Sequence, residues 1–227
     1  MKINEVFNSK FEKFILKYGR LYDSRILKYI KINFNKYLNS DFTPDVLMQI
    51  YSYLDIRNDL VYLEHLDKIQ KYFDIKCNIL EVGCGYLPAF ATLLSSRQLE
   101  LGCGTVTAYD PKLVTLNPKN SNMVLCKESF GEDVIVKDFD LIVGLYPCAA
   151  TEDILKSACM NQKNFYLAMC GCPDPKFPYD TLDFYTDFVL ELAEYLVNKY
   201  DNGVLCYDRV SEKFSGVDYP ILYNKKS

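Results

Sequence analysis

Two glycines and two carboxylates stand where a chain can hold a small polar ligand. The run NILEVGCGYLPAF is a short apolar segment that reaches Glu81, followed by Gly83, Cys84 and Gly85. A strand that enters such a turn and continues into a helix leaves backbone N–H groups at the helix N-terminus, and glycines let a ligand approach the main chain. Asp110 ends the next run, TVTAYD, where a carboxylate can accept hydrogen bonds from both ribose hydroxyls. The sequence therefore predicts a nucleoside ligand at this turn.

The turn suits a ligand without phosphates better than a dinucleotide. A dinucleotide fingerprint has a third small residue three positions after the second glycine, so that a pyrophosphate can sit on the helix N-terminus. This chain has Pro88 there, preceded by Leu87, and proline donates no N–H. S-adenosylmethionine has no phosphate and is the predicted cofactor. NAD or FAD is an alternative, whereas a P-loop is excluded because no Gly-Lys-Ser or Gly-Lys-Thr follows.

Three segments together resemble a known enzyme family. ILEVGCGYLPAF, VTAYDP and FDLIVGLYP are similar to motifs I, II and IV of the class I S-adenosylmethionine-dependent methyltransferases. The resemblance covers residues 75–227 and implies an α/β fold, a Rossmann-like seven-stranded methyltransferase sheet with an antiparallel last strand. It implies methyltransferase activity, and it assigns cofactor binding to Glu81, Gly83, Cys84, Gly85, Asp110, Glu128, Ser129 and Tyr146.

The segment after the fourth expected strand is the candidate for catalysis. Tyr146 and Cys148 follow that strand, which places them by topology at the rim of the glycine turn, next to the transferred methyl. Residues 144–172 resemble a methyltransferase-like subgroup that includes a tRNA ribose methyltransferase family. GCGYLP resembles nicotianamine synthase, which transfers the aminocarboxypropyl group of the same cofactor. Because Tyr146 and Ala149 depart from the subgroup pattern, a cofactor-binding protein without catalysis is a further alternative.

The chain as a whole indicates one α/β domain with an N-terminal all-helical cap. Apolar residues recur at three- and four-residue spacing from 7 to 37, and further amphipathic segments begin near Thr43 and Asn58, so residues 1–74 are expected to be helical. From 75 to 227, apolar β-rich runs alternate with segments that can hold helices, at 77–82, 105–110, 123–126, 139–146 and 164–170. A long helix over 180–200 and two final strands are expected to complete the domain.

Several residues have a structural interpretation beside a functional one. Thr151 is expected to be the N-cap of the helix that follows it. His65 is the only histidine, and with no Cys or His near it in the sequence it is interpreted as structural. Thiols follow several expected strands and could converge on zinc or an iron–sulfur cluster, namely Cys84, Cys148, Cys170 and Cys172. Their spacing is not that of the usual knuckle, so no metal is predicted.

Composition and charge indicate the compartment and the partners. No stretch has the length and apolarity of a membrane helix, and the N-terminus lacks a signal-peptide pattern, so we expect a cytoplasmic protein with no membrane partner. Residues 1–40 carry nine Lys or Arg against three acids, whereas the whole chain has a net charge of -4 and a pI of about 5.2. The acidic pI favours a small-molecule acceptor, and tRNA bound by the cationic segment is the alternative. No residue is typical of a general base, which suits a thiol or amine acceptor; the sequence does not indicate the oligomeric state.

Overall fold

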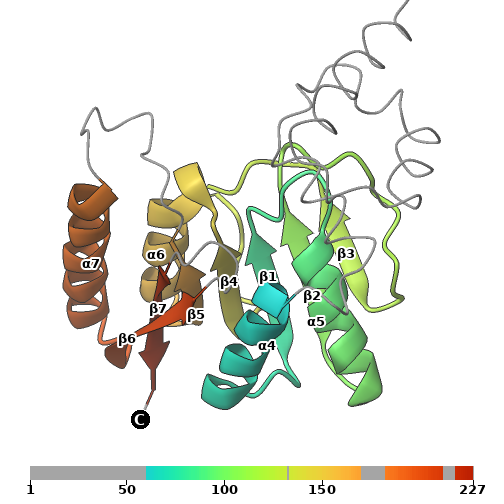
Figure 1. The fold of residues 1–227 in the computed structure, drawn as a ribbon, viewed down its shortest axis with the longest axis horizontal. Coiled ribbons are helices and arrows are strands. Elements are labelled where there is room, and N and C mark those ends of the chain that lie inside the picture. The colour runs from blue at the N-terminus through green and yellow to red at the C-terminus, as the bar shows by residue number, and fades with distance from the viewer. Residues whose placement is uncertain (1–59, 132, 170–181, 212–217, 227) are drawn as a thin grey trace, which may run out of the picture.

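The protein is built on one seven-stranded sheet with the strand order β3-β2-β1-β4-β5-β7-β6 (Figure 1). The computed structural model describes residues 60–131, 133–169, 182–211 and 218–226. The first five strands run parallel, and they are β1 (Asn78–Val82), β2 (Thr105–Tyr109), β3 (Met123–Cys126), β4 (Leu141–Leu145) and β5 (Asn164–Ala168). β7 (Asp218–Lys225) lies antiparallel between β5 and β6 (Val204–Ser211). The expected Rossmann-like α/β sheet with an antiparallel last strand is confirmed.

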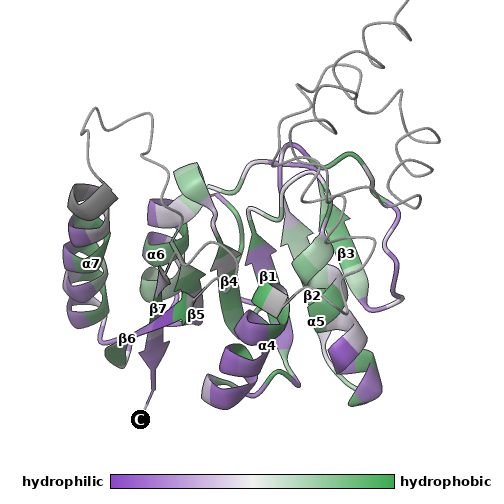
Figure 2. Ribbon diagram, in the orientation of Figure 1, coloured by the Kyte–Doolittle hydropathy of each residue, from purple (hydrophilic) through white to green (hydrophobic). Residues whose placement is uncertain are grey.

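Helices cover both faces of the sheet, and successive strand residues point to opposite faces. α4 (Leu60–Tyr72) and α5 (Ala89–Glu100) pack with Ile79, Val106 and Tyr166 in one apolar cluster. α6 (Thr151–Met160) and α7 (Leu182–Lys199) pack with Leu80 and Ile142 in the other. In Figure 2 the central β4 is green, whereas the edge strand β6 has both purple and green stretches. The parallel strands therefore reach their carboxyl ends from an apolar core on both faces of the sheet.

β4 illustrates why the expected strands could be read as continuous apolar runs. All five of its residues are buried, because a parallel strand covered on both faces has no solvent side. Gly144 is required within it, since a Cβ at this position would lie 2.7 Å from Ile154 on α6 and 3.0 Å from Pro147. α6 and the chain after β4 therefore pack directly on the strand backbone.

Two expectations about local structure differ from the fold. The connections that follow β2 and β3 hold no helix in residues 111–122 or in the described part of 127–140, where Pro111 and Pro118 interrupt the first of them. Thr151 is not the N-cap of α6, because a 3-10 turn, η3 (Cys148–Ala150), leads into the helix and puts Ala150 at that position. The Thr151 hydroxyl instead donates to the Cys148 carbonyl at 2.8 Å. Residues 1–59, most of the expected cap, lie outside the described residues.

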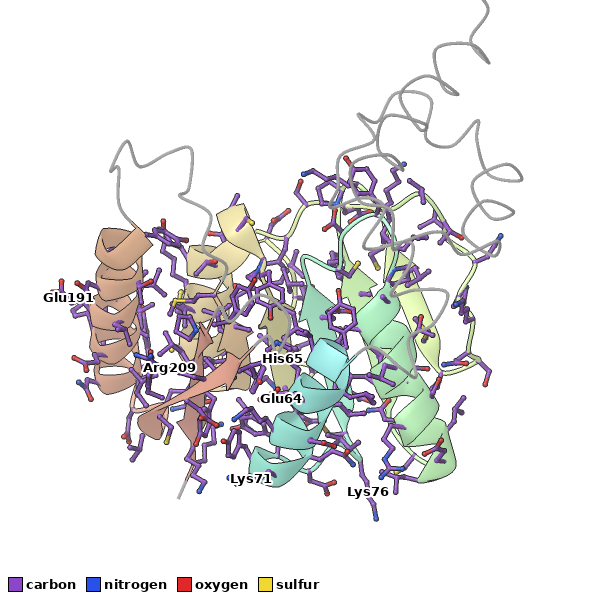
Figure 3. The ribbon with its side chains drawn as sticks, viewed as in Figure 1. Glu64, His65, Lys71, Lys76, Glu191 and Arg209 are labelled. Carbon is purple, nitrogen blue, oxygen red and sulfur yellow. The ribbon has the colours of Figure 1, made fainter. Side chains whose placement is uncertain are left out.

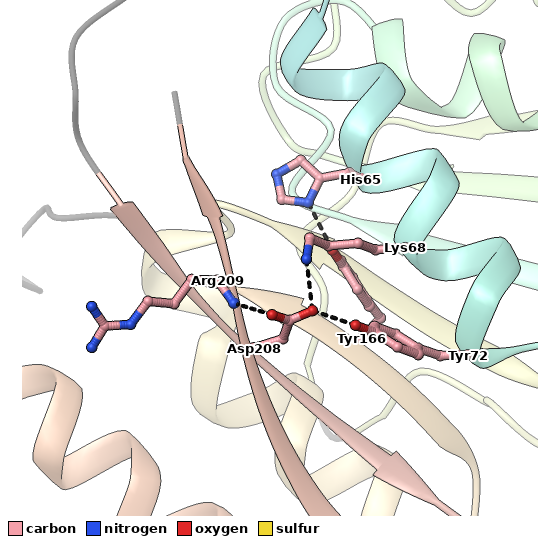
Figure 4. Close-up of polar contacts among 6 residues, drawn as sticks. All are labelled: His65, Lys68, Tyr72, Tyr166, Asp208 and Arg209. Atoms are coloured by element: carbon pink, nitrogen blue, oxygen red, sulfur yellow. Dashed lines mark hydrogen bonds and ion pairs between the residues drawn. The ribbon is translucent and has the colours of Figure 1, made fainter. Parts of the chain in front are cut away.

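α4 is held to the far end of the sheet by one carboxylate. The Lys68 ammonium lies 2.6 Å from Asp208 Oδ2 on β6, and the Tyr72 hydroxyl donates to the same oxygen (Figure 4). The Tyr72 ring stacks on Tyr223 of β7 with centroids 4.1 Å apart. Partial burial works to raise the pKa of Asp208, but the hydrogen bonds from Lys68 and Tyr72 outweigh it and hold that pKa at about 2. These contacts fix the helix that carries His65.

Asp208→Asn should weaken the protein in a pH-dependent way. A carboxylate whose folded pKa of about 2 lies below its unfolded value stabilises the fold above about pH 4, and this contribution is lost as the pH falls toward 2. Because Asp208 is partly exposed, we expect a loss of about 1 kcal/mol at neutral pH that shrinks in acid. Urea unfolding across this range measures it, with Asp187→Asn on α7 as the charge-matched control. A constant difference at all pH values would show that the ion pair is not its source.

Candidate functional site

The glycine turn after β1 is fastened to the end of β2. Gly83 and Gly85 have φ values of 79° and 75°, a left-handed conformation that glycine adopts without steric cost. The Gly83 N–H donates to the Tyr109 carbonyl at 2.9 Å, and the Gly85 N–H donates to Asp110 Oδ2 at 2.8 Å. The structure therefore brings together Gly83, Gly85 and Asp110, the three residues that the sequence assigns to a nucleoside.

One part of the sequence interpretation is corrected here. The turn was expected to leave its N–H groups available to a ligand, but those of Gly83, Cys84 and Gly85 all donate within the protein. α5 begins at Ala89 after the buried Pro88, so the helix N-terminus also lacks the N–H that proline cannot supply. A phosphate would find few donors at this turn, in agreement with the prediction of a ligand that has none.

The loop after β4 packs against this turn. A Cβ at Gly83 would lie 2.9 Å from the Pro147 Cα, so a side chain at this position would collide with the backbone that follows β4. The pairing of Val82 with Gly144 in the β1–β4 ladder places the two strand ends side by side. Gly83 thus serves a close contact within the protein, and this contact sets the candidate catalytic loop beside the turn.

Glu81 is the most unusual ionisable group of the site. Its side chain is buried at the end of β1 and accepts a hydrogen bond from the Ala91 N–H in the first turn of α5, where a negative charge is favourable. Its Oε2 atom is buried and has no hydrogen-bond partner among the described residues. Burial, opposed by the Ala91 bond and reinforced by the nearby Asp110, raises the pKa of Glu81 to about 8. A cationic or donor group of a ligand would complete this carboxylate.

Asp110 ends β2 with both carboxylate oxygens in use. Oδ2 accepts from the Gly85 N–H and Oδ1 from the Lys112 N–H at 2.7 Å, and the side chain is 8% exposed. Each oxygen can accept a second hydrogen bond, so the carboxylate still has capacity for two hydroxyl donors. Burial, with the charges of Glu81 and Asp110, raises the pKa of the Cys84 thiol well above its ordinary value. The Cys84 thiol is therefore neutral beside the two carboxylates.

Glu128 and Ser129 follow β3 at the same rim, and both are exposed. The Asp110 N–H donates to the carbonyl of Cys126, the last residue of β3, at 3.1 Å. This contact joins the end of β3 to Asp110, and Glu128 and Ser129 come shortly after the end of β3. Their assignment to cofactor binding stays a prediction.

Tyr146 and Cys148, the expected catalytic residues, hold an uncommon backbone conformation. Their φ values are 57° and 47°, in the left-handed region that side chains other than glycine and asparagine seldom adopt. The Tyr146 N–H donates to the Ala168 carbonyl at 2.8 Å, and the exposed Cys148 thiol lies 3.5 Å from the Tyr146 carbonyl. Such strain persists only where surrounding contacts enforce it, and it concentrates at functional sites. Tyr146 is the residue here with the stronger contacts.

His65 is the residue of this site that sequence reasoning missed. Its Nε2 lies 2.9 Å from the Tyr146 hydroxyl, and its Nδ1 lies 2.8 Å from the hydroxyl of Tyr166 on β5. Figure 3 shows His65 turned from α4 toward the sheet, while Lys71 and Lys76 point away from it. Burial, with the charge of Lys68, lowers the pKa of His65 to about 3. The available signal was its place on the apolar stripe of its helix, between Val61 and Ile69, where a polar ring needs partners.

The remaining sequence predictions meet the structure only in part. Among the described residues, no group of three or more His, Cys, Asp or Glu side chains is placed to hold a metal ion. Cys170 and Cys172 lie outside those residues, as does the cationic segment 1–40. Within the same described ranges, the helices fall short of the length and apolarity needed to cross a membrane.

Comparison with known proteins finds similar folds among solved structures only. No protein-family model and no curated protein matches the chain. A methyltransferase from Pyrococcus furiosus is 13% identical and superposes with a TM-score of 0.51, over 82% of this chain and 100% of that one. Two further structures are similar. A protein from Methanococcus maripaludis described as an S-adenosylmethionine-dependent methyltransferase is 11% identical, with a TM-score of 0.47 over 79% of this chain and 91% of that one. Precorrin-6y C5,15-methyltransferase from Geobacter metallireducens is 14% identical, with a TM-score of 0.44 over 73% of this chain and 86% of that one. The chain has the class I methyltransferase fold, as its motifs implied.

Gly83→Ala should destabilise the protein more than Gly102→Ala. Both glycines have positive φ values, 79° and 71°, but a Cβ at Gly102 has nothing within 4 Å, whereas one at Gly83 meets Pro147. The left-handed conformation costs alanine about 1–2 kcal/mol at either position. The collision adds about 1–3 kcal/mol at Gly83 alone. Urea unfolding of both variants measures the difference, and equal losses would mean that the loop after β4 does not press on the turn.

Glu81→Gln should stabilise the ligand-free protein at alkaline pH. A carboxyl whose folded pKa of about 8 lies above its unfolded value binds its proton more tightly when folded, so it lowers stability increasingly as the pH rises from about 4 to 8. Glutamine carries no proton to lose, so the variant should gain on the order of 2–4 kcal/mol over the wild type at pH 8 and almost nothing at pH 4. Thermal unfolding at the two pH values measures this gain. The exposed Glu100→Gln on α5 is the control, and a gain that is the same at both pH values would contradict a neutral Glu81.

Proposed function

We propose that the chain is an S-adenosylmethionine-dependent methyltransferase with a small-molecule acceptor. The observation that carries the proposal is the buried Oε2 of Glu81, which has no hydrogen-bond partner in the part of the chain that the structure describes and lies beside a turn with few donors for phosphate. A buried carboxylate without compensation is costly. The ammonium of the amino-acid part of S-adenosylmethionine would supply the missing donor and favour the charged form of Glu81. The fold shared with the Pyrococcus furiosus methyltransferase supports this assignment, because ligands of open α/β sheets bind beyond the carboxyl ends of the parallel strands, where Glu81 lies.

Asp110 supports the nucleoside end of the ligand. Its carboxylate is held by the Gly85 and Lys112 N–H groups, so it is oriented before any ligand arrives. Its remaining lone pairs can accept from two neighbouring hydroxyls, the arrangement that a ribose presents. With Glu81 the carboxylates bracket the turn, one toward a cation and one toward hydroxyls.

When bound, the cofactor supplies an electrophilic methyl group on its sulfonium. The chain's own contribution is orientation: Glu81 and Asp110 fix the ends of the ligand, and the contact of Pro147 with Gly83 sets the loop of Tyr146 and Cys148 beside it. Holding an acceptor in line with a reactive group can supply a large part of the rate enhancement. The role of Tyr146 and Cys148 toward the acceptor is part of this proposal.

S-adenosylhomocysteine should bind the full chain in calorimetry. Asp110→Asn should weaken that binding about 10-fold or more, since a hydrogen bond to a charged group contributes about 1.5–3 kcal/mol. Glu81→Gln should weaken the binding of S-adenosylhomocysteine by a similar factor. It should leave the binding of methylthioadenosine unchanged, because this compound has the nucleoside but no ammonium. Glu100→Gln should alter neither.

The controls separate cofactor binding from catalysis. Absence of heat with wild-type protein, or binding that survives both substitutions, would refute the cofactor assignment. Binding without transfer of labelled methyl to thiol, amine and carboxylate acceptors, or to tRNA, would leave a cofactor-binding protein and refute the enzyme assignment. Labelled transfer to tRNA alone would replace the small-molecule acceptor with RNA.

A further inference from the structure

The two carboxyl groups that flank the glycine turn differ in the hydrogen bonds that they receive. The two oxygens of Asp110 accept from the N–H groups of Gly85 and Lys112, at 2.8 Å and 2.7 Å. Glu81 receives one bond, from the Ala91 N–H, and its Oε2 has no partner among the described residues. Hydrogen bonds from N–H groups favour the charged form of a carboxyl. Of the two groups, Glu81 is therefore the one that holds a proton.

Glu81 points to the face of the sheet that α4 and α5 cover. Its neighbours Leu80 and Val82 alternate with it along β1 and pack with α6 and α7 on the other face. The titratable side chains nearest to it on this face and at the rim are Cys84 in the turn, Asp110 after β2, Cys126 at the end of β3, Tyr146 and Cys148 after β4, and Glu64 and His65 on α4. His65 alone among them is basic, and burial with the charge of Lys68 lowers its pKa to about 3. It is therefore neutral.

The cations of the same elements are engaged away from Glu81. The Lys68 ammonium on α4 lies 2.6 Å from Asp208, and Arg97 in the last turn of α5 lies 2.7 Å from Glu100. The first two turns of α5, from 89 to 96, have no charged residue. Within the described ranges, the carboxyl of Glu81 therefore has an acidic neighbour in Asp110 and no positive group to balance its charge.

Burial completes the argument for a neutral Glu81. Its side chain is 3% exposed, and a buried carboxylate without a cation is costly. Burial, opposed by the Ala91 bond and reinforced by the charge of Asp110, raises the pKa of Glu81 to about 8. Oε2 accepts no bond from the described residues, so it is the oxygen that carries the proton. Two carboxyl groups with different environments then hold different charges at neutral pH.

We propose that Glu81 is a neutral acid in the ligand-free protein and exchanges its proton for the ammonium of the bound ligand, so that the site selects nucleosides that carry a positive charge. The O–H bond of Glu81 breaks, the proton passes to the solvent, and the carboxylate pairs with the ammonium. The inference rests on the proposed function for the identity of the ligand. It makes Glu81 a specificity-determining residue, because a nucleoside without a cation leaves the proton in place.

The exchange makes the affinity for S-adenosylhomocysteine depend on pH. Below the pKa of about 8, binding must remove a proton from Glu81, so the affinity falls as the pH falls. Between pH 6 and pH 8 the affinity of the wild type should rise about 50-fold. In Glu81→Gln this rise should be absent, because glutamine has no proton to lose. Any titration of the ligand itself is common to both proteins and cancels in their ratio.

Calorimetry in two buffers with different ionisation enthalpies counts the protons directly. Binding of S-adenosylhomocysteine to the full wild-type chain should release about 0.9 proton at pH 7 and about 0.5 at pH 8, in excess of the release by Glu81→Gln. The exposed Glu100→Gln is the matched control and should release as much as the wild type. Methylthioadenosine has no ammonium and should release no proton from any of the three proteins.

Infrared spectra of the wild type give a readout that does not need the variant to bind. A protonated carboxyl and a carboxylate absorb at different frequencies, and the difference between the wild type and Glu81→Gln isolates Glu81. At pH 7 the free protein should show a protonated carboxyl, which S-adenosylhomocysteine removes and methylthioadenosine leaves. A carboxylate at Glu81 in the free protein at pH 7 would overturn the proposal.

The outcomes separate this inference from the proposed function. Binding of S-adenosylhomocysteine without net proton release, or an equal release with methylthioadenosine, would overturn the exchange and leave the cofactor assignment in place. Absence of binding to the wild type at every pH from 6 to about 8 would overturn both.

Discussion

The carboxylate of Glu81 is the constraint around which the site is arranged. It is buried where β1 ends and α5 begins, and it uses one oxygen to hold the first turn of α5. Its other oxygen has no partner within the described ranges of the chain. Such a group is stable only as the neutral acid or beside a positive donor. The N–H groups of the neighbouring turn donate to Tyr109 and Asp110. The rim therefore offers acceptors for cations and hydroxyls and few donors for phosphates.

The strands and the turn could be predicted because their signals are local. The apolar runs that became β1 and β4 are continuous since both faces of the sheet are covered, and the left-handed turn needs the two glycines at 83 and 85. The start of α6 could not be predicted, because Thr151 has the side chain of an N-cap yet follows a 3-10 turn that places it inside the helix. Which N–H groups remain for a ligand was likewise decided by tertiary contacts between β1 and β2.

The pairing of His65 with Tyr146 shows where sequence reasoning stops. The two residues are separated by 81 positions and meet only because α4 packs on this face of the sheet, where Lys68 and Tyr72 hold it to Asp208. A polar ring on the apolar stripe of a helix indicates that it needs hydrogen-bond partners, but the sequence does not indicate which residues they are. Tyr146, selected from its place after β4, gains from this contact a physical reason for its left-handed backbone, because a side chain fixed at its far end can enforce local strain.

A crystal structure of the complex with S-adenosylhomocysteine tests the central claim most directly. The account predicts that the ligand ammonium lies within hydrogen-bond distance of Glu81 Oε2, and that both ribose hydroxyls donate to Asp110 while its bonds from Gly85 and Lys112 are kept. A ligand bound elsewhere on the protein, or one whose ammonium leaves Glu81 Oε2 without a partner, would contradict it.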